Sequence, residues 1–153
     1  MEKIKNNKNN KVSINECFIY LNKSETFIGE NRYYCNICKS VSDSVYSSKI
    51  LIAPNILILI LHRGKDIIND VKLEFNETID ITQFVSKRDK PQLIFNLYGV
   101  ITYIDKRHFI ASCKSSLNNK WYRFNDDNIS PISSIQKEVI EFGIPYILFY
   151  QRN

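Results

Sequence analysis

The sequence has no apolar run long enough to cross a membrane, and it has only two histidines among 153 residues. Its longest apolar stretch, Ile50 to Leu61, is interrupted by Pro54 and is shorter than the roughly 20 residues that a membrane helix needs. No secretory signal is visible, because residues 1–11 are polar and rich in Asn and Lys. Four cysteines without such a signal are typical of a reduced, intracellular protein. We therefore expect a location in the cytoplasm or nucleus and no association with a membrane.

Positive charge is only in modest excess, because the net charge of the chain is +5. Much of it lies in residues 1–11, which we predict to be a disordered Asn/Lys-rich tail. No basic stripe with interleaved aromatic residues is present, so we expect no nucleic-acid partner. The chain is 44% hydrophobic, which is enough for a real core. Residues 12–153 therefore suit one domain.

Hydrophobic spacing predicts a β-rich α+β domain with one capped helix near its start. Ser13, with Glu16 three residues later, is typical of a capping box. The apolar face of that helix is predicted to hold Ile14, Cys17, Phe18 and Leu21. Strands are predicted over 44–52, 56–63, 71–75, 79–81, 93–104 and 145–151, and a helical turn over 134–142. The continuous apolar run at 56–63 indicates a strand buried on both faces.

One of the two histidines lies at the start of a predicted hairpin. His108 to Lys114 and Lys120 to Phe124 are typical strands, and the residues between them are polar and turn-prone. With the turn centred near Leu117, opposed residues have numbers that sum to about 233 or 234, which puts His108 opposite Asn125 or Asp126. Such a neighbour fixes one imidazole tautomer, and the histidine can then act as a general base. The alternative is a half-exposed strand histidine with a polar neighbour.

Cys35 and Cys38 form a single Cys-x-x-Cys pair. A tight turn presents two thiolates to one metal, but a structural zinc takes four ligands. Cys17 is expected in the core, Cys113 lies far away in sequence, and His62 has no ligand spacing to the pair. The pair is therefore half of a zinc site, a degenerate site, or two free thiols in a turn. Beyond this structural zinc, we expect no required cofactor.

Seven segments, in order, resemble motifs of the catalytic domain of the ubiquitin-specific proteases, which are papain-like cysteine deubiquitinases. "SINECF" resembles the helix start S-L-x-x-C, "CNIC" the second zinc-knuckle Cys pair, and "APNILILILHR" the strand P-x-x-L-x-x-x-L-x-R. "FNLYGVITY" resembles Y-x-L-x-x-V, and "RHFIAS" resembles G-H-Y-x-A-Y. "KWYRFNDDNIS" resembles W-Y-x-F-[DN]-D-x-x-V, and "YILFYQR" resembles the closing Y-x-L-F-Y. The resemblance covers Ser13 to Arg152.

The resemblance implies a fold, a reaction and roles for named residues. The fold is the β-rich palm and partial fingers of a papain-like protease domain, with the thumb and its Cys box absent. His108 would be the general base, Asn125 its orienting residue, and Asp126 an adjacent acidic residue that supports the site. Cys35 and Cys38 would be half of a zinc knuckle. The implied reaction is hydrolysis of the isopeptide bond after the C-terminal glycine of ubiquitin, which would be the partner.

The departures from the family pattern concern the nucleophile and the residues around the histidine. Nothing resembles the G-N-T-C-Y box that carries the cysteine nucleophile, and Arg107 replaces a glycine beside the histidine. A Tyr of the pattern is Phe109 and a Phe is Gly64. Cys113 is five residues from His108 on one strand, roughly 16 Å away, so it is no substitute.

Three interpretations remain open. The chain is a deubiquitinase fragment that needs the N-terminal half of the domain, a non-catalytic ubiquitin-binding or regulatory module, or a nonfunctional remnant. Alone, we expect it to be inactive.

Overall fold

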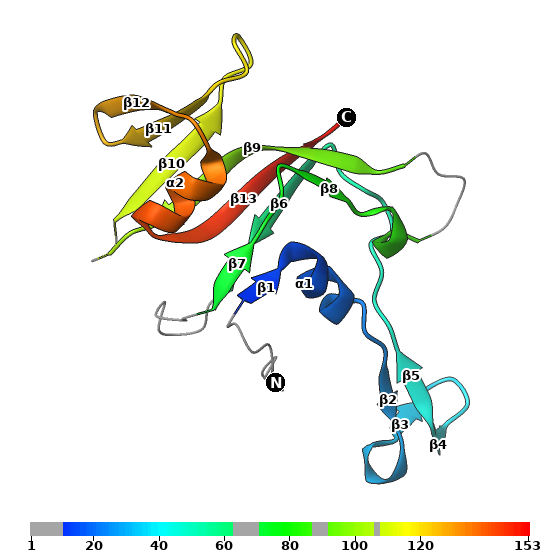
Figure 1. Cartoon of the computed structure of the whole chain (residues 1–153). Helices are drawn as coiled ribbons and strands as arrows, with labels where there is room; N and C mark the ends of the chain where they lie inside the picture. Colours follow the sequence, from blue (N-terminus) through cyan, green and yellow to red (C-terminus); the bar gives the residue numbers. More distant parts are fainter. Residues whose placement is uncertain (1–10, 63–70, 87–91, 106–107) are drawn as a thin grey trace.

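The two longest strands, β9 (Ile94–Tyr103) and β13 (Ile144–Arg152), lie side by side at the centre of a seven-stranded antiparallel sheet. The computed structural model describes residues 11–62, 71–86, 92–105 and 108–153. The strand order is β12-β11-β10-β9-β13-β6, and β8 pairs with the beginning of β9 (Figure 1). The other five strands are β6 (Ile56–Ile60), β8 (Thr78–Asp80), β10 (Phe109–Lys114), β11 (Trp121–Asn125) and β12 (Asn128–Ile132).

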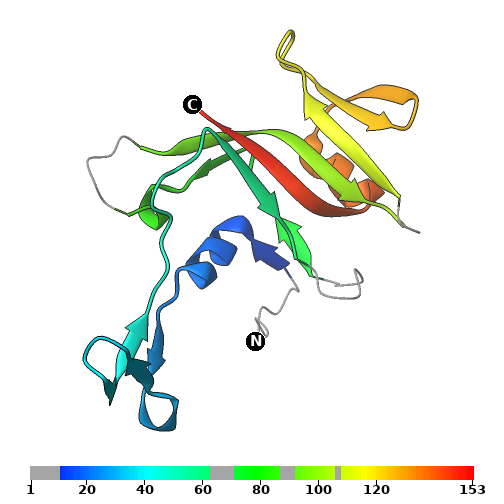
Figure 2. The same ribbon diagram turned by 180° about the vertical axis from the view of Figure 1, so that it is seen from behind.

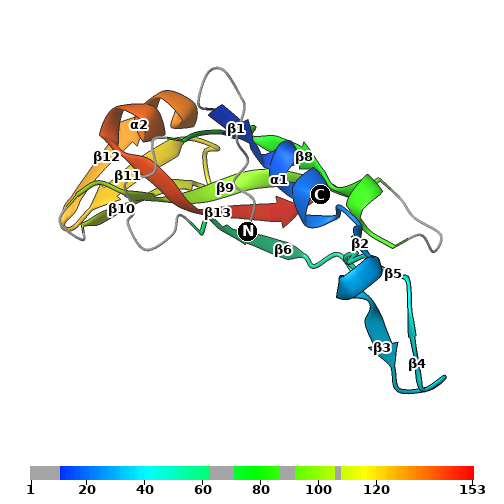
Figure 3. The ribbon, with the colours of Figure 1, turned by 90° about the horizontal axis from the view of Figure 1, so that it is seen from below.

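Both α-helices begin at a serine cap. At the start of α1 (Ile14–Leu21), the Ser13 hydroxyl accepts the N–H of Glu16, and the Glu16 carboxylate accepts the N–H of Ser13. These bonds lower the pKa of Glu16. Ser134 caps α2 (Ile135–Phe142) by accepting the N–H of Lys137. Figure 3 shows α1, α2 and β1 (Lys11–Ser13) on the same side of the sheet. β1 pairs in parallel with β7 (Lys72–Glu74).

The core lies between the helices and the sheet face that they cover. Leu148 and Tyr150 of β13 are fully buried there. Phe18 of α1 stacks on Phe84 of the short 3-10 helix η2 (Thr82–Phe84), with ring centroids 5.1 Å apart. The Tyr150 hydroxyl donates to the carbonyl of Asn76 at 2.8 Å, so its polar end has a partner inside the core. No helix within the described ranges is long and apolar enough to cross a membrane.

Residues 22–48 form a narrow arm that extends from the body (Figure 1). It consists of two antiparallel pairs, β2 (Glu25–Phe27) with β5 (Ser44–Tyr46), and β3 (Tyr33–Cys35) with β4 (Ser40–Ser42). A 3-10 turn, η1 (Gly29–Asn31), joins the two pairs. No residue of the arm is buried. The arm therefore depends on backbone hydrogen bonds rather than on a core of its own.

The β-rich α+β prediction is confirmed, but three local predictions are wrong. β6 is an edge strand: Ile56, Ile58 and Ile60 are exposed, and only the alternate residues pack on the core, so it is not buried on both faces. The predicted strand 44–52 is short, since β5 ends at Tyr46. Leu21 is exposed rather than on the packed face of α1. Of the predicted tail, residues 1–10 lie outside the described residues, and Lys11 already belongs to β1.

Candidate functional site

The predicted hairpin is present as β10 and β11, and its turn is tight. The N–H of Ser115 donates to the carbonyl of Lys120 at 2.8 Å, and Asn119 has a left-handed φ of 57°. The register pairs Ala111 with Phe124, one or two positions beyond the predicted partner. The reason is that the turn is centred between Leu117 and the next residue rather than on Leu117. The hairpin prediction is therefore confirmed, and its predicted register is wrong.

The structure nevertheless brings His108 against Asn125. His108 Nε2 lies 2.7 Å from Asn125 Oδ1, and both residues are half-buried. An amide oxygen only accepts hydrogen bonds, so Nε2 carries the proton and donates it. The other ring nitrogen, Nδ1, is then an unprotonated acceptor, which is the form that a general base requires.

The backbone around His108 is fixed by two hydrogen bonds. Its N–H donates to the carbonyl of Asp105 at 2.6 Å, and its carbonyl accepts from the N–H of Ile104 at 3.0 Å. Phe109, the next residue, packs against Tyr103 and Tyr146, with ring centroids 5.2 and 5.4 Å apart. These contacts hold the start of β10 and so fix the position from which the imidazole extends.

Asn125 ends β11 and opens a second tight hairpin. It pairs with Asn128 of β12, and Asp126 occupies the intervening turn with a left-handed φ of 51°. Asp126 is exposed in that turn. The structure therefore brings together His108 and Asn125, while Asp126 shapes the turn beside them. We did not predict β12 from the sequence, although the polar Asn-Asp-Asp-Asn run before Ile129 is typical of a two-residue turn.

An ion pair on the same face of β11 supports this end of the strand. Arg123, two residues before Asn125, places Nη1 3.2 Å from Glu138 Oε1 of α2. Its guanidinium also lies 4.3 Å from the centre of the Phe142 ring. Glu138 Oε1 has no hydrogen bond of good geometry in the described structure, so the contact with Arg123 is mainly electrostatic. The sequence analysis did not identify Arg123 and Glu138, because the sequence does not show that Arg123 lies next to α2.

None of the four cysteines is placed as a partner of His108. Cys17 lies on α1, and Cys35 and Cys38 lie on the arm. Cys113 pairs with Tyr122 near the far end of β10, and its alternation puts it on the sheet face opposite Ser112. Partial burial raises the pKa of the Cys113 thiol, which lowers its thiolate fraction. The site therefore has a base and an orienting residue, but the described residues bring no nucleophile to it.

Cys35 and Cys38 lie at the tip of the arm, at the end of β3 and in the turn after it. Cys35 Sγ accepts hydrogen bonds from the backbone N–H groups of Cys38 and Ile37, and these bonds lower the pKa of the thiol. That arrangement favours a thiolate ligand. However, the described residues hold no cluster of three or more metal-binding side chains. Two sulfurs do not complete a tetrahedral zinc site. Arg63, Gly64 and Arg107, where the sequence matches or departs from the family pattern, lie outside the described residues.

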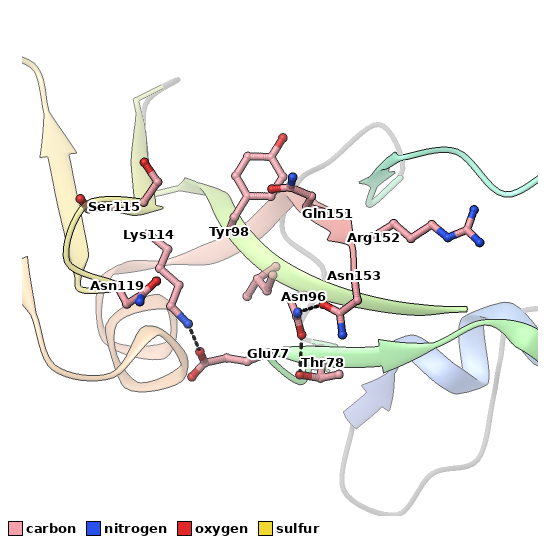
Figure 4. A pocket seen from close by; sticks show the side chains of 12 residues that line it. Glu77, Thr78, Asn96, Tyr98, Lys114, Ser115, Asn119, Gln151, Arg152 and Asn153 are labelled. Atoms are coloured by element: carbon pink, nitrogen blue, oxygen red, sulfur yellow. Dashed lines mark hydrogen bonds and ion pairs between the residues drawn. The ribbon is translucent and has the colours of Figure 1, made fainter. Parts of the chain in front are cut away.

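A separate polar cavity of about 730 Å³ lies at the other end of the hairpin, between its turn and the ends of β9 and β13 (Figure 4). Lys114 and Glu77 approach to 3.7 Å at its wall, and Thr78 donates to Asn96 at 3.0 Å. Asn96 also donates to Asn153. These polar groups largely bond one another. The cavity does not include His108 or Asn125, so it is distinct from the candidate site.

A model of the family described as ubiquitin carboxyl-terminal hydrolase matches residues 1–150. Among curated proteins, ubiquitin carboxyl-terminal hydrolase 8 of Saccharomyces cerevisiae is 30% identical over 92% of this chain and 32% of its own length. Ubiquitin carboxyl-terminal hydrolase 25 of Arabidopsis thaliana is 33% identical over 92% of this chain and 22% of its own length. The chain thus spans about a third or less of these relatives.

Solved structures of deubiquitinase modules also contain chains that are similar in fold to this one. The fold is similar to a chain of the SAGA Ubp8/Sgf11/Sus1/Sgf73 DUB module bound to ubiquitin aldehyde, with a TM-score of 0.73 and 25% identity. The similarity covers 94% of this chain and 35% of that chain. A second structure holds the same module, with a substituted Ubp8, bound to monoubiquitin, again with a TM-score of 0.73 and 25% identity.

Proposed function

The chain belongs to the ubiquitin carboxyl-terminal hydrolase family, and from that premise we propose that it supplies the histidine half of a deubiquitinating active site. His108 is the general base and Asn125 orients it. The observation that carries the proposal is the 2.7 Å contact between His108 Nε2 and Asn125 Oδ1, because it leaves Nδ1 free to accept a proton. Asp126 supports the site by shaping the turn that follows Asn125.

The proposed reaction is hydrolysis of the isopeptide bond after the C-terminal glycine of ubiquitin. Nδ1 of His108 takes the proton from a cysteine thiol, and the resulting thiolate attacks the glycine carbonyl. The imidazolium then gives that proton to the leaving lysine amine, and the acyl-enzyme is hydrolysed by water that His108 deprotonates in turn. The Asn125 amide oxygen keeps the ring oriented without adding a charge. The thiol comes from the N-terminal half of the family domain rather than from the described residues of this chain.

Ubiquitin and that N-terminal half are the proposed partners, in the cytoplasm or nucleus. Support for ubiquitin comes from the solved relatives bound to ubiquitin aldehyde and to monoubiquitin. The Cys35–Cys38 pair is proposed to be half of a zinc knuckle, which the same N-terminal half would complete.

The test is to co-express this chain with a family segment that carries the cysteine box, and to measure release of a fluorophore from the ubiquitin C-terminus. We expect no turnover by the chain alone and measurable turnover by the pair. His108→Ala should reduce that turnover by about 10²–10⁴-fold, the usual contribution of a general base. Asn125→Ala should reduce it less. Unchanged turnover in His108→Ala would refute the assignment of the base.

A second candidate function is a non-catalytic ubiquitin-binding module. The observation that favours it is the placement of all four cysteines away from His108. A chain that binds ubiquitin, and that never cleaves it when paired with the cysteine-box segment, would establish this function instead. Binding of ubiquitin to the chain alone is measured by calorimetry, with His108→Ala as the matched variant, and absence of binding would refute the binding module; cleavage by the paired chains separates the two functions.

A further inference from the structure

His108 and Asn125 both lie just beyond the hydrogen-bonded ladder that joins their two strands. The register of β10 with β11 ends at Ala111 and Phe124. His108 directly precedes β10, and Asn125 is the last residue of β11. The 2.7 Å contact between the two side chains is therefore not fixed by the ladder itself. A movement of about 1 Å between these strand ends would break the contact, because hydrogen bonds are lost beyond roughly 3.5 Å.

The two residues are held by different parts of the sheet. The His108 carbonyl accepts the N–H of Ile104, which directly follows β9, at 3.0 Å, so the histidine is bonded to the end of β9. Asn125 pairs with Asn128, so it belongs to the β11–β12 hairpin at the edge of the sheet. The distance between the imidazole and the amide therefore depends on how that hairpin is held relative to β9.

α2 contacts the Asn125 side of the site through Arg123. Arg123 precedes Asn125 by two residues, so both side chains leave β11 on the face that α2 covers. The Arg123 guanidinium lies 3.2 Å from Glu138 Oε1 and 4.3 Å from the centre of the Phe142 ring. Across the strands, Arg123 pairs with Ser112, which is fully buried on the same face. Figure 2 views the sheet from the opposite side and shows α2, in orange, behind it.

The end of α2 contacts the His108 side of the site through Gly143. This glycine follows the last residue of the helix, and the next residue, Ile144, pairs with Tyr103 at the end of β9. A side-chain carbon on Gly143 would collide with the Tyr103 carbonyl oxygen and would lie 3.2 Å from the Cα of Ile104. Only glycine permits so close an approach. The end of the helix is therefore held against the segment to which His108 is bonded.

We propose that α2 sets the distance between His108 and Asn125, with Glu138 as a positioning residue that acts through Arg123. This inference rests on the proposed function, in which the contact with Asn125 decides which ring nitrogen accepts the proton. One helix contacts both sides of the site, namely the hairpin that carries Asn125 and the end of β9 to which His108 is bonded. Without the Glu138 carboxylate, the end of the hairpin moves against β9, and the Asn125 amide loses its fixed place beside Nε2. The two ring tautomers then become closer in population, and the base loses part of its orientation.

The experiment records long-range ¹⁵N–¹H spectra of the whole 153-residue chain at alkaline pH, where an imidazole is neutral. The two tautomers of His108 are quantified in the native chain, in Glu138→Ala and in Arg123→Ala, and His108→Ala identifies the signals. Glu141→Ala, at an exposed position of the same helix, is the matched control. We expect the ratio of the Nε2–H to the Nδ1–H tautomer to fall by about 2- to 10-fold in both ion-pair variants, the effect of losing one hydrogen bond, and to stay native in the control.

A second pair of variants tests the other end of α2. Gly143→Ala forces the end of the helix away from Tyr103, and we expect the same fall in the tautomer ratio. Gly99→Ala is the matched control, because its added carbon would lie 3.4 Å from the Phe149 side chain, an ordinary contact. Urea denaturation of each variant identifies conditions in which it is fully folded. The spectra are compared only there, so a loss of stability alone does not change the ratio.

The outcomes separate this inference from the proposed function. Native tautomer ratios in both Glu138→Ala and Arg123→Ala overturn the role of α2, and so does an equal fall in Glu141→Ala. The spectra need no nucleophile, so either result leaves the proposed function standing. In the pair with the cysteine-box segment, Glu138→Ala should lower kcat by a similar factor and leave KM unchanged, whereas a raised KM with a native kcat overturns the inference. A native pair that never cleaves ubiquitin refutes the proposed function alone, because the tautomer ratio still reports the role of α2.

Discussion

At the scale of single residues, the neighbour of His108 decides which ring nitrogen carries the proton. Because Asn125 Oδ1 accepts from Nε2 at 2.7 Å, we expect the Nε2–H tautomer to dominate when the ring is neutral. Asn125→Ala removes the acceptor and should give a mixture of both tautomers. Long-range ¹⁵N–¹H spectra of the chain alone measure the ratio without any nucleophile. Asn128→Ala, on the partner position of the same hairpin, is the control. An unaltered tautomer ratio in Asn125→Ala would remove the basis for its orienting role.

Cys35 and Cys38 are also best tested as single residues. The backbone N–H bonds that lower the pKa of Cys35 favour a thiolate, but two sulfurs leave a zinc ion half liganded. We therefore expect weak, substoichiometric zinc binding by calorimetry, and its loss in Cys38→Ser. The contrary result, a tight one-to-one complex that needs both cysteines, would mean that this chain supplies two more ligands, with Cys17 and His62 the first to substitute.

At the scale of elements, one ion pair links α2 to the strand that carries Asn125. The Arg123 and Glu138 side chains are 26% and 10% exposed, so the pair is partly shielded from water. Glu138→Ala removes the carboxylate partner of Arg123, whose guanidinium keeps its contact with the Phe142 ring. We expect it to lower the free energy of unfolding by about 1–3 kcal/mol, less than for a fully buried pair. Urea denaturation measures the effect, with Glu141→Ala on the exposed side of α2 as the control. Equal urea midpoints for Glu138→Ala and Glu141→Ala would mean that the ion pair does not contribute to the stability of the fold.

The sequence predicted those elements whose signals are local. Ser13 and Glu16 marked the start of α1, and the alternation from His108 to Phe124 marked the hairpin. What failed depended on neighbours far away in the chain. The apolar run at 56–63 was predicted to be a strand buried on both faces, because nothing in it shows that β6 ends the sheet. The hairpin register failed by one or two positions, because the sequence does not show that Asn119 adopts a left-handed φ. The contact of His108 with Asn125 was nevertheless among the pairings predicted.

At the scale of the whole molecule, stability is unevenly distributed between the body and the arm. β9 pairs with three strands and packs on the buried core, whereas residues 22–48 include no buried residue. We expect amide hydrogens of β9 and β13 to exchange slowest with deuterium, and those of β3 and β4 to exchange fastest, because exchange follows local opening. Mass spectrometry of the exchanging chain gives the order. Arm protection equal to that of β9 would show that the arm is held by contacts beyond its own backbone pairs.

The place of β13 in the sheet has a consequence for protein synthesis. β13 lies between β9 and β6, so β6 gains its hydrogen-bonded neighbour only when residues 144–152 have been translated. Until then, the backbone N–H and C=O groups on both edges of the apolar segment Ile56–Ile60 have no partner strand in the nascent chain. A ribosome that stops before Ile144 would release a product whose sheet is missing a central strand, and such products are prone to aggregate and to be degraded. Sequence errors that truncate the gene late are therefore expected to be as damaging as those that truncate it early.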